Sequence, residues 1–379
     1  MSEAIKELKD KLLYKRVKTY EVMTEADMAA ANEYAKGYMA FLDGGKTERE
    51  CVSYTIKMVE AQGYVEYKLG DKIEKGGKYY YNNRGRAIYV FRIGSENVEE
   101  GIRISASHID SPRLDLKPHP LYEDNGVGYL KTHYYGGVKK YQWVAMPLAL
   151  HGTVIKADGT SVDIIIGEDD SDPVFYISDL LPHLAKDQMA RNAREVIPGE
   201  KLNLMAGTLP LPEAGGEGVK LALMKLLYEK YGIVEADFIS AELEVVPAFK
   251  AREIGLDRSL IGAYGHDDRV CSYPAVTALL ESDDSVHTVM AILADKEEVG
   301  SGGNSGMKSG IFVDLIDEIS KQLGANVNVV KANSKCLSAD VNAGMDPTFK
   351  DVMESRNAAK LNHGAVITKY TGARGKSGT

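Results

Sequence analysis

This sequence has few cysteines, no long apolar run and no excess of positive charge. Its three cysteines, Cys51, Cys271 and Cys336, are isolated and odd in number, which excludes a disulfide framework and is typical of a reducing compartment. The apolar run Val289 to Ala294 is far shorter than the roughly 18 residues that a membrane helix requires. The first residues, MSEAIKELKDKLLYKR, predict a charged helix without the apolar core of a signal peptide. We therefore expect a cytoplasmic protein that does not enter a membrane.

The charge balance argues against a nucleic-acid partner. Lys and Arg total 46 against 55 Asp and Glu, which gives a net charge of −9, and the basic residues are dispersed among carboxylates. Binding to phosphates requires clustered Lys and Arg, so the composition indicates a different kind of ligand.

The length predicts two packed bodies. The chain has 379 residues, of which 44% are hydrophobic, and it exceeds the roughly 250 to 300 residues at which a single core stops growing. Proline-marked changes in pattern suggest a discontinuous catalytic domain at 1–121 and 246–379, with an inserted domain at 122–245.

The outer segments predict an α/β layered domain. Helical patterns cover residues 1–63, and short β-rich runs predict neighbouring strands at Ala87–Ile93 and Gly101–Ser107. Further on, Arg269–Glu281 and Ile311–Leu323 are predicted helices, and Thr288–Ala294, Asn326–Val330 and Ala365–Thr368 are predicted strands. Thr288–Ala294 is apolar on both faces, which is typical of a parallel central strand covered by helices.

The middle of the chain differs in character. Tyr and Gly are frequent, as in YYGGVKKYQW, and predicted strands such as Thr153–Ala157 and Val162–Ile166 alternate with turns. One helix is predicted at Gly218–Tyr231, before a strand at Phe238–Val246. The inserted domain is therefore expected to be mostly β.

Four clusters of acidic residues or histidine follow predicted strands, the place where ligands collect in open α/β sheets. In SASHIDSPRL, the spacing of His108 and Asp110 suits a metal-bound imidazole oriented by a carboxylate, although a hydrogen-bonded surface histidine fits equally well. In GHDDR, a carboxylate could bridge two metal ions because it has two oxygens, although helix capping explains these residues more simply.

The third cluster, DKEEVGS, is the most informative because its charges follow an apolar strand. One of Glu297 and Glu298 could ligate a metal while the other acts as a general base toward water; the alternative is a solvated loop. In the fourth, SADVNAGMDP, Asp340 taken alone is a loop aspartate. Together, His108, Asp267, Glu298 and Asp340 form a nitrogen and oxygen ligand set that suits two ions of zinc, cobalt or manganese.

In this order, the clusters SASHIDSPRL, GHDD, DKEEVGS and SADVNAGMDP resemble the M18, or aspartyl aminopeptidase, family of di-metal peptidases. NHGAVITKY, YYGGVKKYQW and LLPHLAKDQ extend the resemblance over nearly the whole chain. The resemblance implies an aminopeptidase that hydrolyses N-terminal residues from peptides. It also implies that the inserted domain mediates dimerisation within a homo-oligomer, up to a dodecamer built from dimers.

The resemblance also implies roles for individual residues. His108 would ligate one metal and Asp110 would orient it, while Asp267 would bridge both ions. Glu297 would be the general base, with Glu298 on the second metal and Asp340 on the first. His183 in LLPHLAKDQ is a candidate substrate-binding residue that would reach a neighbouring subunit, although a helix-surface histidine is an equally good interpretation.

One part of the family pattern has no counterpart here. The family has a second histidine ligand in a downstream strand, and no position matches it; His363 comes too early and receives no role. We accordingly expect the final GARGKSGT to be an interior substrate-site loop of a larger enzyme.

Two further interpretations follow from the same residues. The clusters specify water activation rather than a substrate, so a deacylase or carboxypeptidase also fits. A non-catalytic assembly protein would explain both the unmatched ligand and the Tyr/Gly-rich insertion.

Overall fold

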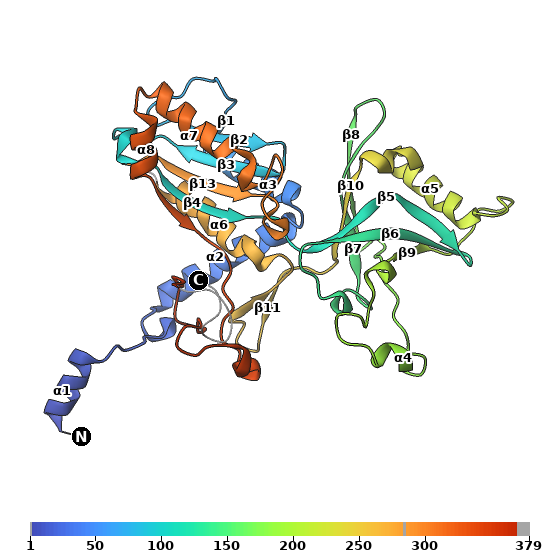
Figure 1. Cartoon of the computed structure of the whole chain (residues 1–379), viewed down its shortest axis with the longest axis horizontal. Coiled ribbons are helices and arrows are strands. Elements are labelled where there is room, and N and C mark those ends of the chain that lie inside the picture. The colour runs from blue at the N-terminus through green and yellow to red at the C-terminus, as the bar shows by residue number, and fades with distance from the viewer. Residues whose placement is uncertain (1, 283–285, 370–379) are drawn as a thin grey trace. The chain divides into compact units, whose positions relative to one another are not determined.

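The structure is a computed structural model that describes residues 2–282 and 286–369. Within this part of the chain, strands form two six-stranded sheets, named here A and B, and one two-stranded hairpin (Figure 1). The chain divides into two compact units, one of Tyr38–Asp340 and a smaller one of Met1–Gly37 with Val341–Thr379. Both sheets and the hairpin belong to the larger unit.

Sheet A has the strand order β1-β2-β3-β13-β4-β14. β13 pairs in parallel with β4 and antiparallel with β3, and β14 pairs in parallel with β4. The sheet is therefore mixed, with three parallel strands at one side. Its strands are β1 (Val65–Glu66), β2 (Lys78–Asn83), β3 (Ala87–Arg92), β4 (Arg103–His108), β13 (Val289–Ala294) and β14 (Lys335–Ser338).

β13 lies at the centre of sheet A because both of its faces are apolar. Ala291 and Leu293 pack into one core cluster, together with α3 (Glu48–Glu60) and α6 (His266–Glu281). Met290 and Ile292 pack into the opposite cluster, with α7 (Ile311–Gln322) and α8 (Val327–Asn333). Helices cover both faces of the sheet, which confirms the predicted α/β layers.

Two local predictions for sheet A were wrong. The segments Ala87–Ile93 and Gly101–Ser107 share the sheet as β3 and β4, but β13 lies between them, because the central place goes to the strand that is apolar on both faces. The segment Asn326–Val330 begins helix α8 instead of forming a strand. The Asn326 side chain caps the helix by accepting a hydrogen bond from the Asn328 amide, and Val330 packs under the sheet.

Sheet B is antiparallel throughout, with the order β8-β7-β10-β5-β6-β9. Its core includes Leu114, Leu150, Leu204 and Val245, and Leu223 and Leu227 of helix α5 (Gly218–Tyr231) pack against it. The β5–β6 hairpin turns at Asn125 and Gly126, which both have positive φ, as the tightest hairpin turns require. The strands are β5 (Arg113–Asp124), β6 (Val127–Tyr135), β7 (Leu148–Ile155), β8 (Ser161–Ile166), β9 (Leu204–Gly207) and β10 (Glu242–Pro247).

The remaining elements are short or lie near the ends of the chain. The hairpin of β11 (Arg252–Ile254) and β12 (Leu260–Gly262) precedes α6, and α4 (Lys186–Met189) is a single turn. Helix α1 is Glu3–Leu12, and α2 is Glu25–Gly44. No helix among the described residues is long and apolar enough to cross a membrane.

In the smaller unit, the predicted strand Ala365–Thr368 is irregular chain. Its neighbour His363 contacts the carbonyl oxygen of Val17 through Nδ1 at 2.9 Å, and Asn342 donates its side-chain amide to the Thr368 hydroxyl at 2.7 Å. Side-chain contacts therefore hold this segment. The segment GARGKSGT lies outside the described residues, and the domain boundaries at 121/122 and 245/246 stay a prediction.

Candidate metal centre

Three parallel strands of sheet A bring polar residues to one edge of the sheet. β4 ends at His108, Glu297 follows the end of β13, and Asp340 follows the end of β14. In the register of the sheet, Ala294 at the end of β13 lies beside His108, and Ser338 at the end of β14 lies beside Ala106. The three strands therefore end within about two residues of one another, on the same side of the sheet. Asp267, in the first turn of α6, completes the group.

The side chains of His108, Asp267, Glu297 and Asp340 converge on one point. His108 Nε2 lies 3.2 Å from Asp267 Oδ1, 3.7 Å from Glu297 Oε2 and 4.0 Å from Asp340 Oδ1. Ligand atoms of His108, Asp267 and Asp340 all lie within 4.8 Å of one another, a spacing that could hold a metal ion.

His108 Nε2 is a buried nitrogen without a hydrogen-bond partner. The side chain is 4% exposed, and Nδ1 lies 3.0 Å from the carbonyl oxygen of Asp110 and 3.2 Å from its Oδ1. Both of these atoms accept hydrogen bonds, so an imidazole bound to a metal through Nε2 would keep its proton on Nδ1 and direct the Nε2 lone pair toward the side of the carboxylates. Burial would lower the pKa of His108, but the neighbouring Asp110 and Asp267 outweigh it and raise the pKa to about 11.

Asp110 is fully buried and organises the residues around His108. Its Oδ1 accepts the Glu297 amide at 3.1 Å, and its Oδ2 accepts the Glu298 amide at 3.2 Å. Tyr135 donates its hydroxyl to Oδ2 at 2.7 Å. Burial opposes the charge of Asp110, but the bonds from His108 and Tyr135 outweigh it and lower the pKa of this carboxyl.

The two adjacent glutamates lie in different surroundings because the chain turns after β13. Lys296 has φ of 66°, and a single 3-10 turn, Glu297–Val299, follows it. The Glu297 side chain is 51% exposed, whereas Glu298 is half-buried beside Gly136. Burial, reinforced by the nearby Asp267, raises the pKa of Glu298 to about 7.

Asp268 is buried next to Asp267 and faces β4. Its Oδ2 accepts the His108 amide at 3.4 Å, and its Oδ1 has no hydrogen-bond partner. Burial raises the pKa of Asp268 to about 6. The Asp267–Asp268 peptide bond is cis, and Ser111 donates its hydroxyl to the carbonyl of Asp267 at 2.8 Å.

Sequence reasoning missed a buried ionic network that underlies this edge of the sheet. Glu48, which is fully buried at the start of α3, binds both Arg86 and Arg113, and Arg86 also contacts Asp295 at 3.0 Å. Burial opposes the charge of Glu48, and the two arginines outweigh it and lower its pKa. In the sequence Glu48 is an ordinary acidic residue of a first helical turn, so nothing there signals the network.

Sequence reasoning also missed Tyr135 and Gly136 at the end of β6. Their segment, YYGGVKKYQW, contributes its composition and a part of the family resemblance to the sequence argument, and neither gives these two residues a role. His183, in contrast, lies in an exposed turn before α4 and is not part of the group around His108. Its suggested role at a neighbouring subunit stays a prediction.

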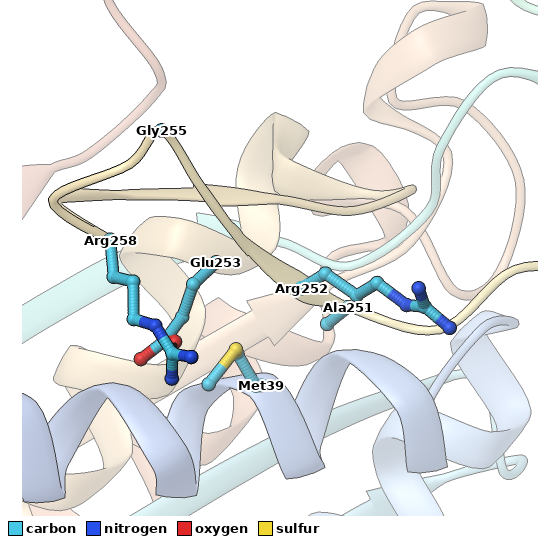
Figure 2. Close-up of a pocket in the computed structure, with 6 residues that line it drawn as sticks. All are labelled: Met39, Ala251, Arg252, Glu253, Gly255 and Arg258. Atoms are coloured by element: carbon cyan, nitrogen blue, oxygen red, sulfur yellow. Dashed lines mark hydrogen bonds and ion pairs between the residues drawn. The ribbon is translucent and has the colours of Figure 1, made fainter.

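Two pockets of the larger unit lie apart from His108. One, of about 490 Å³, is lined by Met39 and by the β11–β12 hairpin. Figure 2 shows its two arginines pointing in different directions, and Arg258 binds Glu253 at 3.2 Å. The second, of about 630 Å³, is lined mainly by carboxylates around His151. Neither contains a residue of the His108 group.

Residues 41–379 match the model of a protein family described as "Aminopeptidase I zinc metalloprotease (M18)". A probable M18 family aminopeptidase 1 of Clostridium acetobutylicum is 50% identical over 347 residues, which cover 89% of this chain and 75% of that protein. This chain belongs to the M18 family of zinc metallo-aminopeptidases. The M18 relative from Thermotoga maritima is 45% identical, and the match covers 91% of this chain and 77% of that protein.

Solved M18 structures have the same fold. The crystal structure of the Thermotoga maritima aminopeptidase superposes with a TM-score of 0.90 at 43% identity, over 96% of this chain and 80% of that one. The Clostridium acetobutylicum aminopeptidase I gives a TM-score of 0.88 at 45% identity, over 97% and 81%. A structure described as the S. cerevisiae mApe1 dodecamer shares the fold at 23% identity, with a TM-score of 0.71, over 87% of this chain and 77% of that one.

Proposed function

We propose that this M18 chain is a di-metal aminopeptidase that removes N-terminal residues from peptides and uses Glu297 as its general base. The observation that carries the proposal is the buried, unpartnered Nε2 of His108, which faces the carboxylates of Asp267, Asp340 and Glu297. A buried nitrogen without a partner is costly unless a ligand occupies the space in front of it.

The residues at this point fit zinc. One imidazole and several carboxylates are ligands that zinc accepts, and the absence of thiolates among them is typical of catalytic rather than structural sites. His108, Asp267 and Asp340 would hold one ion, and Glu298 with the shared Asp267 would hold the second. When bound, the ions supply Lewis acidity, which polarises the scissile carbonyl and lowers the pKa of water.

Side chains of the protein would carry out the proton transfer. Glu297 is half exposed and lies 3.7 Å from His108 Nε2, so its carboxylate can accept a proton from the attacking water and pass it to the leaving amine. Asp110 contacts His108 Nδ1 and accepts a hydrogen bond from the Glu297 amide. These two contacts fix the position of the general base, Glu297, relative to the metal ligand, His108.

The proposal predicts that Glu297→Gln removes turnover but not zinc binding. The amide keeps the size of the side chain but cannot take a proton, so kcat should fall by about 10² to 10⁴. The measurement is amino acid release from unblocked peptides with zinc, cobalt or manganese, and Glu281→Gln at the exposed end of α6 is the control. Full activity in Glu297→Gln, or no turnover by the unmodified chain with any of the metals, would contradict the proposal.

The same assay separates the other hydrolase interpretations. Acetylation of the peptide N-terminus should abolish cleavage by an aminopeptidase, whereas a deacylase or carboxypeptidase would still act on the blocked peptide. Stoichiometric zinc binding without hydrolysis across the peptide panel would instead favour the non-catalytic assembly protein.

We also propose that the chain forms homo-oligomers built from dimers, up to a dodecamer, through the insertion predicted at 122–245. The proposal is supported by the fold that this chain shares with the structure of the S. cerevisiae mApe1 dodecamer. A cytoplasmic location, inferred from the scattered cysteines, stays a prediction.

A further inference from the structure

The end of strand β6 in sheet B lies directly against the metal centre on sheet A. Tyr135 donates its hydroxyl to Asp110 Oδ2 at 2.7 Å. The next residue, Gly136, is so close to Glu298 that an added Cβ would lie 3.1 Å from Glu298 Oε2 and 3.2 Å from Glu298 Cβ. The last residue of β6 and the residue that follows it therefore contact two residues of the metal centre.

A buried arginine packs against the Tyr135 ring and holds it in place. The Arg113 guanidinium lies 4.0 Å from the ring centroid, and Arg113 faces Tyr135 in the β5–β6 register. Arg113 is itself held by carboxylates at 2.8 Å from Asp115, 3.1 Å from Glu244 and 3.2 Å from Glu48. The ring cannot turn away without breaking this contact, so the direction of the hydroxyl is set in advance.

The hydroxyl completes the set of hydrogen bonds around the Asp110 carboxylate. Oδ1 contacts His108 Nδ1 at 3.2 Å and the Glu297 amide at 3.1 Å, whereas Oδ2 contacts the Glu298 amide at 3.2 Å and Tyr135 at 2.7 Å. Without the hydroxyl, Oδ2 would keep only the Glu298 amide among these partners, and the carboxylate could rotate away from His108.

We propose that Tyr135 is a positioning residue through which sheet B fixes the Asp110 carboxylate, and through it His108 and the Glu297–Glu298 turn. This inference rests on the proposed function, because it presumes that His108 and its neighbours bind metal. The Tyr135 hydroxyl contacts the Asp110 carboxylate, so it acts through that residue.

The test is Tyr135→Phe in the full chain, which keeps the ring over Arg113 and removes only the hydroxyl. Zinc affinity of the metal-free protein is measured by calorimetry, the visible spectrum is recorded with cobalt, and kcat and KM are measured separately. We expect a roughly tenfold loss of zinc affinity, a shifted cobalt spectrum and a lower kcat at nearly constant KM. The unfolding temperature should fall only modestly, because one hydrogen bond to a buried carboxylate is lost while the ring stays in place.

Tyr134→Phe is the matched control, since it removes the same hydroxyl from the adjacent residue, whose side chain is 44% exposed. It should leave all of these quantities at their original values. Equal zinc affinity and cobalt spectra in Tyr135→Phe and the unmodified chain would overturn the positioning role alone. Failure of the unmodified chain to bind zinc would overturn the proposed function and the positioning role together.

Discussion

At the scale of single residues, the centre depends on Asp110, a fully buried carboxylate that does not face the space between His108 and the exposed acids. Four groups donate to its two oxygens: the His108 ring, the Glu297 and Glu298 amides and the Tyr135 hydroxyl. A carboxylate can accept all of these bonds at once because it carries no donor of its own when ionised. Asp110 therefore joins the end of β4 to the turn after β13.

Asp110→Asn should disrupt this arrangement although it is nearly isosteric. An amide nitrogen would have to face one of the donating groups, and the charge that supports His108 would be lost. We expect zinc affinity to fall by about 10- to 100-fold and unfolding free energy to fall by about 1 to 3 kcal/mol. Calorimetric zinc titration and urea unfolding measure the two effects, with the exposed Asp187→Asn as control. Wild-type affinity in Asp110→Asn would show that His108 needs no orienting carboxylate.

At the scale of elements, Gly136 lets β6 end in contact with the turn that carries Glu298. It has φ of +70° and leaves no ordinary space for a Cβ beside the Glu298 side chain. Glycine is therefore required at this position for two reasons, the left-handed backbone conformation and the close approach of Glu298.

A comparison of Gly136→Ala with Gly126→Ala separates these two requirements. Gly126 also has a positive φ, of +75°, but the space around it is open. Both substitutions should therefore lower the free energy of unfolding by about 1 to 2 kcal/mol, because alanine is strained in the left-handed region. Only Gly136→Ala must also displace Glu298 by a few tenths of an ångström. We expect similar losses of unfolding free energy, but reduced peptide turnover and weaker binding of a second zinc ion in Gly136→Ala alone. Equal activity in the two variants would argue that Gly136 does not set the position of Glu298.

Some of these elements could be predicted from the sequence and others could not. The apolar strand β13 and the charged turn after it were predictable, because a strand covered on both faces and a cluster at its end leave a local pattern. The convergence of His108 and Asp340 followed from strand ends meeting at one edge, whereas Asp267 joins them from the first turn of helix α6. Helix α8 was missed because its valines favour strands, and these outweighed the local signal of the Asn326 cap, while the contact of Val330 with sheet A comes from the fold. Tyr135 could not be predicted, since its partner Asp110 lies in the irregular segment after β4, 25 residues away in the sequence.

At the scale of the larger unit, a second buried histidine ties α3 to sheet B. His151 on β7 is 2% exposed and lies between two carboxylates, with Nδ1 at 2.8 Å from Glu50 and Nε2 at 3.0 Å from Glu168. Lys46, also 2% exposed, contacts the same Glu168 oxygen at 2.6 Å. Burial alone would lower the pKa of His151, but the two glutamates outweigh it and raise the pKa. Burial likewise opposes the charge of Glu168, and His151 and Lys46 outweigh it and lower its pKa.

These opposite shifts predict a pH window for the stability of the chain. His151 has a raised pKa in the folded state, so its contribution is complete below about pH 6.5 and is lost as the pH rises through the folded value. Glu168 has a lowered pKa, so its contribution is complete above roughly pH 4.5 and is lost as the pH falls through the folded value. We expect His151→Asn to cost about 1 to 3 kcal/mol of unfolding free energy between these limits, and less as the medium becomes alkaline. Urea unfolding at several pH values, with a chelator present, measures the difference, and the exposed His119→Asn on β5 is the control. A cost for His151→Asn that stays constant or grows with rising pH would show that the charge on His151 does not stabilise the contact between α3 and sheet B.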